Sequence, residues 1–192
     1  MKAKDIEQKE HIDKWISKGC RGTSIAATGI GKTRMGLMAV KYILDKDNNN
    51  TALIVVPTEN LRDNEWPNEI KKWGLSKYSD RIDVQCVQTV YKWENYNCSI
   101  LVVDEVHTTL SYEYRNLYEN NRFDNIYCLT ATPPENDEYR SYLKSFAPIV
   151  RKTDTLDALD MELISPYSVY NLAVSFTEEE AKLLVETKIG GL

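Results

Sequence analysis

The sequence predicts an α/β fold: a three-layer sandwich with a mainly parallel central sheet. Five short apolar runs occur in the first 132 residues, and each has the length of one strand. Two of them, residues 52–56 and 99–103, are continuous rather than alternating, which is typical of strands covered on both faces. Amphipathic helical segments separate the runs, and this alternation indicates right-handed crossovers between parallel strands. The other predicted strands are residues 23–27, 82–87 and 126–129.

Two helices are predicted between these strands from apolar residues at helical spacing. The first ends before the asparagines at positions 48–50, because asparagine favours turns. The second follows the strand at 99–103. The apolar positions are Met35, Met38, Ala39, Tyr42 and Ile43 in the first helix, and Leu110, Tyr114, Leu117 and Tyr118 in the second.

The pattern changes after residue 148. Residues 148–155 are interpreted as a connector, and Leu156, Leu159 and Leu163 predict a short helix after it. We therefore expect residues 1–150 to form one lobe, followed from 151 by a connector.

The last part of the chain predicts a strand and a helix. Residues 169–176 alternate with period two, which is typical of a half-exposed strand, and residues 177–180 match the capping box that opens a helix. A strand and a helix alone cannot bury a core. We expect residues 151–192 to contain a connector and the start of a second domain, as a short C-terminal strand-helix extension.

Composition limits the possible functions. The chain has 192 residues, enough for one domain with an appendage, and 24 Lys and Arg against 29 Asp and Glu give a net charge of −5. A nucleic-acid partner would therefore be bound by a local site rather than a broad positive field. The longest apolar run, residues 52–56, is far shorter than the roughly 20 residues of a membrane helix, and residues 1–5 begin no secretory signal. We expect a soluble cytoplasmic protein with no membrane partner.

The cysteines and histidines indicate no metal site. Cys20, Cys86, Cys98 and Cys128 have no C-x-x-C spacing and lie in or beside apolar runs. Buried free thiols are favoured over metal ligands or disulfides. The chain has two histidines, which argues against a zinc site made by protein ligands alone.

The strongest motif follows the first predicted strand and opens the first helix. It has the form G-x-x-x-x-G-K-[ST], with Ala26 in place of the first glycine. Glycines let backbone amides turn toward a polyanion, the helix start adds positive potential, and the lysine reaches the β and γ phosphates. The alternative is a glycine-rich turn with a solvated lysine. The candidate nucleotide-binding residues are Thr28, Gly29, Ile30, Gly31, Lys32 and Thr33, and the Thr33 hydroxyl would ligate magnesium.

An acidic pair, Asp104 and Glu105, ends the buried strand at 99–103. Burying two carboxylates is costly unless a cation or a reaction uses them. Asp104 would hold magnesium through water, and Glu105 would polarise the water that attacks the γ phosphate. The alternative is a solvated turn. A phosphate loop after one strand and an acidic pair after another is the layout of a P-loop nucleotidase, with Lys32, Asp104 and Glu105 as catalytic residues.

Five ordered motifs resemble those of superfamily 2 helicases, over about residues 6 to 135. Asp104-Glu105-Val106-His107 resembles a DExH box, and Thr130-Ala131-Thr132-Pro133 follows the next strand. The phosphate loop resembles motif I, residues 56–61 resemble motif Ia, and residues 88–91 resemble motif Ib. The resemblance implies the first RecA-like lobe of an ATP-dependent nucleic-acid motor, with ATP and Mg²⁺ as cofactors.

The resemblance also implies roles for single residues. His107 and Thr130, Ala131 and Thr132 would couple nucleotide state to nucleic-acid grip, although for His107 a polar turn is the alternative. Gln8 lies at the spacing of the adenine-reading glutamine, although Glu7 replaces the aromatic residue often found before it, and a surface helix position is the alternative. Pro57, Thr58, Arg62 and Thr89 would contact the phosphodiester backbone, and a solvated Arg62 is equally consistent with the sequence.

The implied motor is incomplete in this sequence. Motors of this superfamily complete their ATP site with arginines from a second RecA-like lobe, and no such motif follows residue 151. We expect the chain to bind nucleotide, to hydrolyse it slowly and not to unwind a duplex alone. DNA is favoured over RNA as the partner, from the likeness of the Pro57-Thr58 segment to DNA-acting members. The alternatives are a nucleotide-gated module that clamps nucleic acid or protein without translocating, and the motor part of a restriction or repair complex.

Overall fold

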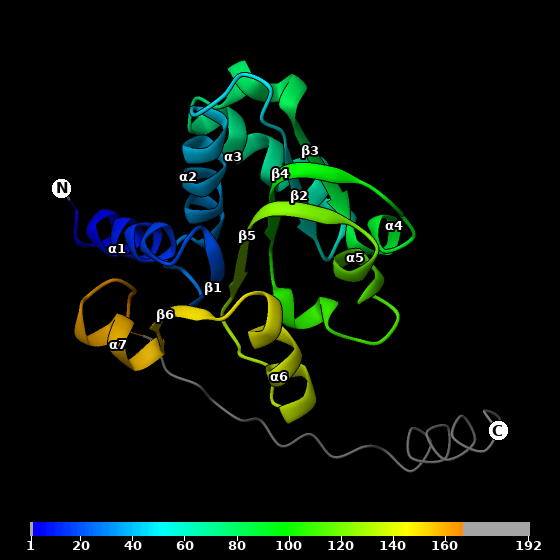
Figure 1. Cartoon of the computed structure of the whole chain (residues 1–192). Helices are drawn as coiled ribbons and strands as arrows, with labels where there is room; N and C mark the ends of the chain where they lie inside the picture. The colour runs from blue at the N-terminus through cyan, green and yellow to red at the C-terminus, as the bar shows by residue number, and fades with distance from the viewer. Residues whose placement is uncertain (1, 167–192) are drawn as a thin grey trace, which may run out of the picture.

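The structure, a computed structural model, describes residues 2–166. These residues form three layers, with a central sheet between two layers of helices (Figure 1). The strand predicted at 169–176 and the helix after it lie outside the described residues.

Six strands form one sheet in the order β3-β2-β4-β5-β1-β6. Every neighbouring pair is parallel, so the predicted parallel sheet is confirmed. The carboxyl ends of the strands therefore share one edge, where ligands bind in folds of this kind. The strands are β1 (Arg21–Ala26), β2 (Ala52–Val56), β3 (Ile82–Cys86), β4 (Asn97–Val103), β5 (Arg122–Thr130) and β6 (Ile149–Thr153).

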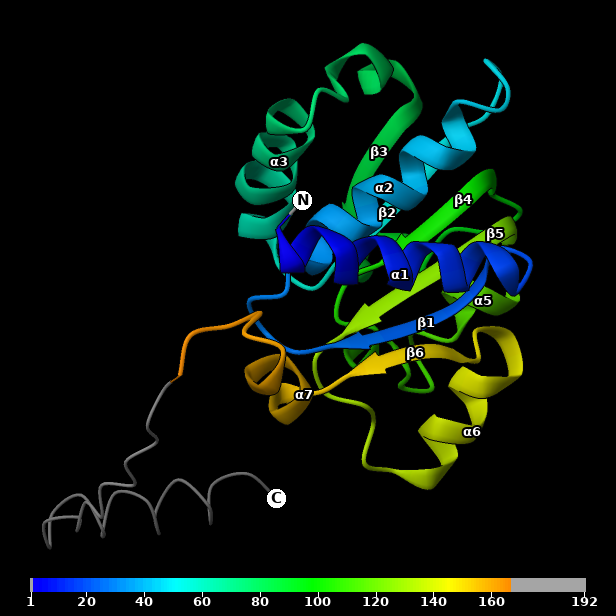
Figure 2. The same cartoon turned by 90° about the vertical axis from the view of Figure 1, so that its left-hand side faces the viewer.

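Helices cover both faces of the sheet (Figure 2). One face carries α1 (Ala3–Ser17), α2 (Lys32–Leu44) and α3 (Trp66–Lys72). The other carries α4 (Val87–Val90), α5 (Asn116–Glu119) and α6 (Asp137–Phe146). After β6 comes α7 (Thr155–Asp160). The short helix predicted from Leu156, Leu159 and Leu163 is therefore confirmed at the first two positions, and Leu163 lies beyond its end.

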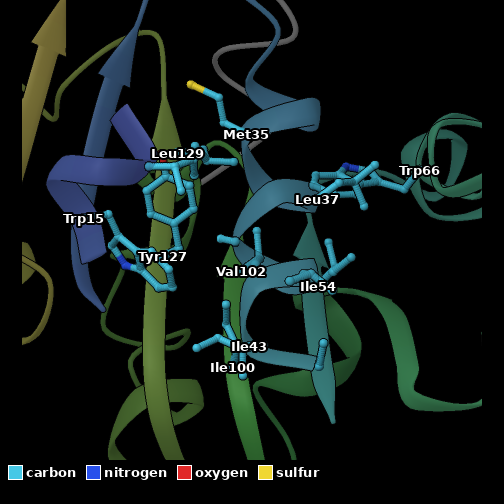
Figure 3. Close-up of a cluster of buried hydrophobic side chains, with 14 of the residues drawn as sticks. Trp15, Met35, Leu37, Ile43, Ile54, Trp66, Ile100, Val102, Tyr127 and Leu129 are labelled. Carbon is cyan, nitrogen blue, oxygen red and sulfur yellow. The ribbon is translucent and has the colours of Figure 1, made fainter. Parts of the chain in front are cut away.

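The continuous apolar strands are buried on both faces, as predicted. In β2, Ile54 belongs to the core on the α2 face of the sheet, whereas Leu53 and Val55 belong to the core on the opposite face. Figure 3 shows the first of these two cores, in which the fully buried Trp15 and Trp66 reach the sheet from α1 and α3. All four cysteines are free and buried, as the sequence predicted.

The interpretation of residues 148–155 as a connector is wrong. Residues 149–153 form β6, which pairs in parallel with β1 at the edge of the sheet, so the expected lobe boundary after residue 150 falls inside a strand. Arg151 and Lys152 interrupt any apolar run there. Charged side chains are common on edge strands, since one side of the strand stays open to solvent.

The helix predicted from Leu110 to Tyr118 is also wrong. A 3₁₀ turn at Val106–Thr109 lies just before this segment, and within it the only helix is the single turn α5, which begins at Asn116. The Thr109 hydroxyl donates to the Val106 carbonyl (2.8 Å) and Arg115 Nε donates to the Leu110 carbonyl (3.3 Å). Side chains thus satisfy carbonyls that a continuous helix would have bonded.

Candidate functional site

The phosphate loop lies between β1 and α2 at the carboxyl edge of the sheet. Gly29 and Gly31 have φ angles of +90° and +99°, in the left-handed region that L side chains avoid. Gly31 directly precedes the first turn of α2, which begins at Lys32. Thr28 and Gly29 are exposed, Thr33 is half-buried, and the Ile30 side chain is buried. The loop therefore turns free amides toward the open edge of the sheet, as an anion site requires.

Lys32 joins the phosphate loop to the acidic box. Its Nζ lies 3.1 Å from Oε1 of Glu105, so the two motifs meet although β1 and β4 are separated by β5. Asp104 is only 6% exposed, and its Oδ2 accepts a hydrogen bond from Trp66 Nε1 (3.1 Å). Burial raises the pKa of Asp104 to about 6, and the neighbouring Glu105 charge acts in the same direction. Lys32, Asp104 and Glu105 are called the loop–box cluster below.

Glu105 is also the point on which the predicted coupling residues converge. Its Oε2 lies 3.2 Å from Thr130 Oγ1 and accepts from the backbone N–H of Ala131 (3.4 Å). His107 Nδ1 lies 2.9 Å from Thr130 Oγ1, and the N–H of Thr132 donates to the same hydroxyl oxygen (3.1 Å). Glu105 itself has a left-handed φ of +49°, a strained conformation of the kind found at functional sites.

Gln8 reaches the phosphate loop from α1. Its side-chain Nε2 donates to the carbonyl of Ile30 (2.6 Å), and its Oε1 accepts from Arg34 (2.6 Å). Gln8 is 2% exposed, so the alternative of a surface helix position is wrong. A Cβ at Gly31 would collide with the Gln8 amide, which gives a second reason for glycine there.

The predicted nucleic-acid residues follow strands β2 and β3 at the carboxyl edge of the sheet. Pro57 follows β2 and Thr89 lies in α4 after β3, and Gln88 bridges the two segments by donating to the Pro57 carbonyl (3.3 Å). Thr58 and Thr89 are exposed. Arg62 lies in the helical turn Leu61–Glu65, is half-buried and pairs with the adjacent Asp63 at 2.7 Å, so both the nucleic-acid contact and the solvated helix position stay predictions.

Residues 4–135 match the family described as "Type III restriction enzyme, res subunit". The chain belongs to this family. It is therefore a superfamily 2 helicase-type domain with one RecA-like lobe, and the family is one that uses ATP.

The family assignment agrees with individual relatives. The chain is 29% identical over 188 residues to "DNA 3'-5' translocase XPB2" of Sulfurisphaera tokodaii. That match covers 91% of this chain and 41% of the relative, so the chain spans about two fifths of the relative's length.

Solved structures show the same fold. The UvsW helicase from bacteriophage T4 matches with a TM-score of 0.61 and 18% identity, over 75% of this chain and 58% of that one. The Hef helicase domain of Pyrococcus furiosus matches with a TM-score of 0.57 and 19% identity, over 78% and 39%. The Type ISP restriction-modification enzyme LlaGI, solved with a DNA substrate mimic, matches with a TM-score of 0.61 and 14% identity, over 96% and 22%.

A second buried polar cluster, the α1–β6 cluster, joins α1 to the edge strand of this lobe. The Glu7 carboxylate accepts two hydrogen bonds from Arg151 (both 2.9 Å) and one from the Thr153 hydroxyl. His11 Nε2 lies 3.2 Å from Glu7 Oε1 and 3.0 Å from Thr153 Oγ1. Burial lowers the pKa of His11 to about 4, although the Glu7 charge opposes that shift.

Sequence reasoning missed several residues of the site. Trp66 holds Asp104 from α3, and Arg34 holds Gln8 from the first turn of α2. Trp66 lies close enough to α2 that a Cβ at Gly36 would be 2.7 Å from its ring. Each of these contacts joins residues at least 26 positions apart, so local spacing carries no signal for them. For Arg34, the position directly after the phosphate loop was the sequence feature that could have indicated a role in the site.

A cavity of about 560 Å³ opens beside the phosphate loop. This is the size range of small-ligand sites. The cavity is lined by Lys4, Gln8, Gly29, Gly31, Thr33, Arg34, Glu65, Asn68, Glu69, Lys72 and Trp73.

Among the residues 2–166 no helix is long and apolar enough to cross a membrane.

Proposed function

We propose that this chain is the nucleotide-binding lobe of an ATP-dependent nucleic-acid motor, with ATP and Mg²⁺ held between the phosphate loop and the acidic box. The observation that carries the proposal is the 3.1 Å contact between Lys32 Nζ and Glu105 Oε1. It supports a single centre in which a cation for phosphate, a buried carboxylate for metal and a second carboxylate for water lie together.

The donor set at this centre fits magnesium. Thr33 supplies a hydroxyl and Asp104 a carboxylate, both hard oxygen ligands. The raised pKa of Asp104 marks a negative charge that the apolar surroundings disfavour, and a nearby divalent cation would stabilise it. No group of three or more His, Cys, Asp or Glu within the described part of the chain could hold a metal alone, so water and phosphate oxygens would complete its shell. Bound there, magnesium would neutralise phosphate charge.

The chain's own residues would then divide the work. The amides of Gly29, Gly31, Lys32 and Thr33 would bind phosphate oxygens, and Lys32 would exchange its Glu105 partner for the β and γ phosphates. Glu105 would orient the attacking water and take its proton on a carboxylate oxygen. The contacts of Thr130 and Ala131 with Glu105 Oε2 support a fixed orientation for this carboxylate.

We propose DNA as the nucleic acid, since the curated relative is described as a DNA translocase. Thr58 and Thr89 are exposed, and their hydroxyls, with the backbone after Pro57, would contact phosphodiester groups without reading sequence. Arg62 would add charge there once released from Asp63. His107, through Thr130, would pass the state of Glu105 toward this surface. A second RecA-like lobe would supply arginines for turnover.

Nucleotide titration tests the proposal. We expect Lys32→Ala to lose ATP binding measured by calorimetry with Mg²⁺, because Lys32 is the residue of the phosphate loop that would bind the β and γ phosphates. Glu105→Gln should bind ATP but stop the slow hydrolysis expected of this chain. Lys9→Ala is the matched control, since Lys9 is exposed and pairs only with Asp13. ATP binding by Lys32→Ala at wild-type strength would refute the site, and normal hydrolysis by Glu105→Gln would refute its role as base.

A nucleotide-gated clamp is the second candidate, favoured by the contacts from Glu105 through Thr130 to His107 inside this one lobe. Titration of single-stranded and duplex DNA, with and without a non-hydrolysable ATP analogue, separates the two. A clamp should couple the two ligands in this chain alone, whereas a motor lobe should couple them only after a second lobe is added.

A further inference from the structure

The Arg34 side chain, beside the phosphate loop, contacts two residues of α1 and one residue that follows α3. Its Nη1 donates to Gln8 Oε1 (2.6 Å) and to the Asp5 carboxylate, both on α1. Its guanidinium carbon lies 4.2 Å from the ring centroid of Trp73, which follows α3. A guanidinium stacked on an indole and paired with a carboxylate has little freedom to move. The loop–box cluster does not use this arginine.

The contacts of Arg34 and Ile30 set the direction of the Gln8 amide. Oε1 accepts from Arg34 and Nε2 donates to the Ile30 carbonyl. If the amide turned over, its oxygen would face the carbonyl oxygen and its NH₂ would face the guanidinium, and both contacts would be repulsive. A glutamine amide has two hydrogens and two oxygen lone pairs. After these two bonds, one hydrogen and one lone pair of Gln8 are left for the cavity that it lines.

A fixed amide distinguishes purine bases. Adenine presents an acceptor, N7, beside a donor, the N6 amino group, and a glutamine amide matches this pair. Guanine presents two acceptors, N7 and O6, so O6 would meet the Gln8 oxygen. A free amide could relieve this partly by rotating, because the last torsion of glutamine is broad. With Arg34 in place, rotation breaks two hydrogen bonds, a buried one to Ile30 and a partly buried one from Arg34.

We propose that Arg34 is a positioning residue that holds the Gln8 amide in the one orientation that accepts adenine and rejects guanine. This inference rests on the proposed function, because it assigns base selectivity to the same nucleotide site. It places the specificity in the pair of Arg34 with Gln8 rather than in Gln8 alone. The free-energy cost of binding a guanine nucleotide then includes breaking the hydrogen bonds of the Gln8 amide to Arg34 and Ile30.

The test measures binding of ATP and GTP separately, each with Mg²⁺, to wild type and Arg34→Leu. Wild type should prefer ATP, and the ratio of the Kd for GTP to the Kd for ATP should fall about tenfold in Arg34→Leu, the scale of one bidentate base contact. Arg34→Lys should keep part of the preference, because lysine still has a donor for Oε1. Arg140→Leu, on the opposite face in α6, is the control for loss of one arginine.

Tripolyphosphate separates base reading from damage to the phosphate loop. Its affinity should not change in Arg34→Leu, and an equal loss for ATP, GTP and tripolyphosphate would overturn the proposal. Wild type that binds ATP and GTP equally would overturn it while leaving the proposed function intact, whereas wild type that binds neither would refute both. If Arg34→Leu does not fold, Trp73→Leu removes the ring that holds the guanidinium at a 39% exposed position. It should lower the same ratio by a smaller factor.

Discussion

Two buried clusters of charge lie near the same edge of the sheet and differ in how fully they are paired. In the α1–β6 cluster, the Glu7 carboxylate receives two bonds from Arg151 and one from Thr153. Burial alone would raise the pKa of Glu7, but the bonds from Arg151 and Thr153 outweigh it and lower that pKa. In the loop–box cluster, burial raises the pKa of Asp104, and Lys32 contacts Glu105.

We propose that this difference separates a structural cluster from one arranged for a ligand. In the α1–β6 cluster both Glu7 oxygens have donors, so the carboxylate charge is balanced within the folded chain, although His11 Nδ1 is buried there without a partner among the described residues. The loop–box cluster has two carboxylates and one lysine, so a negative charge is left without a partner. Such an imbalance lowers stability and is common where a site awaits a ligand of opposite charge. Substitutions in the two clusters should therefore change stability in opposite directions.

The largest effect is expected from Glu7→Ala, which leaves Arg151 and Thr153 without their acceptor. We expect the free energy of unfolding to fall by about 2–3 kcal/mol, somewhat below the usual range for a broken buried pair because Arg151 is partly exposed. Urea unfolding followed by circular dichroism measures it. Glu10→Ala is the control, since Glu10 bonds the same arginine (2.6 Å) from a half-exposed position. Similar losses in both variants would contradict the contrast between buried and exposed partners.

Asp104→Asn should act in the opposite direction. Asparagine keeps an oxygen for Trp66 Nε1 and removes the buried charge, so we expect the free energy of unfolding to rise by about 1–2 kcal/mol without nucleotide. The same variant should lose magnesium-dependent ATP binding. Urea unfolding and calorimetry measure the two effects. A destabilised Asp104→Asn that still binds ATP with Mg²⁺ would show that the loop–box cluster is structural.

The smallest expected effect is the pH dependence contributed by His11. Its folded-state pKa is about 4, below the ordinary 6.5, since burial disfavours the cation. Between these values the unfolded chain binds a proton that the folded chain does not, so stability falls as the pH falls from 6.5 toward 4. The groups facing His11 are Glu7, Arg151 and Thr153. Replacement by a residue that does not titrate, His11→Gln, should flatten this slope by about 1 kcal/mol per pH unit.

The His11 effect is read from unfolding curves at several pH values. The wild-type curve should fall more steeply than that of His11→Gln above pH 4.5, where Glu7 does not yet contribute. Parallel curves would mean that His11 is protonated in the folded chain, and the α1–β6 cluster would then have to include a second cation.

Much of the fold was predictable because it depends on local patterns of apolar residues and glycines. The continuous run in β2 indicates burial on both faces, and the positive φ of Gly29 and Gly31 follows from a loop that must turn amides toward a phosphate. The wrong predictions concern segments whose structure depends on tertiary contacts rather than on the local sequence pattern. Strand β6 is charged because it is an edge strand, and residues 106–119 bend because Thr109 and Arg115 bond the carbonyls that a helix would use. Helices α1, α3 and α6 were not predicted.

The parallel sheet, the phosphate loop, the acidic box and the family could be predicted from the amino-acid sequence, because each depends on residues adjacent in the chain or on a short repeat. The distant groups that contact the candidate site became known from the folded structure. Trp66 reaches Asp104, Arg34 orients Gln8, and Glu7 pairs with Arg151, across 26 to 144 positions of sequence. Such contacts depend on how α1, α3 and β6 pack on the sheet. Because packing brings together residues with no fixed spacing along the chain, no local pattern encodes them.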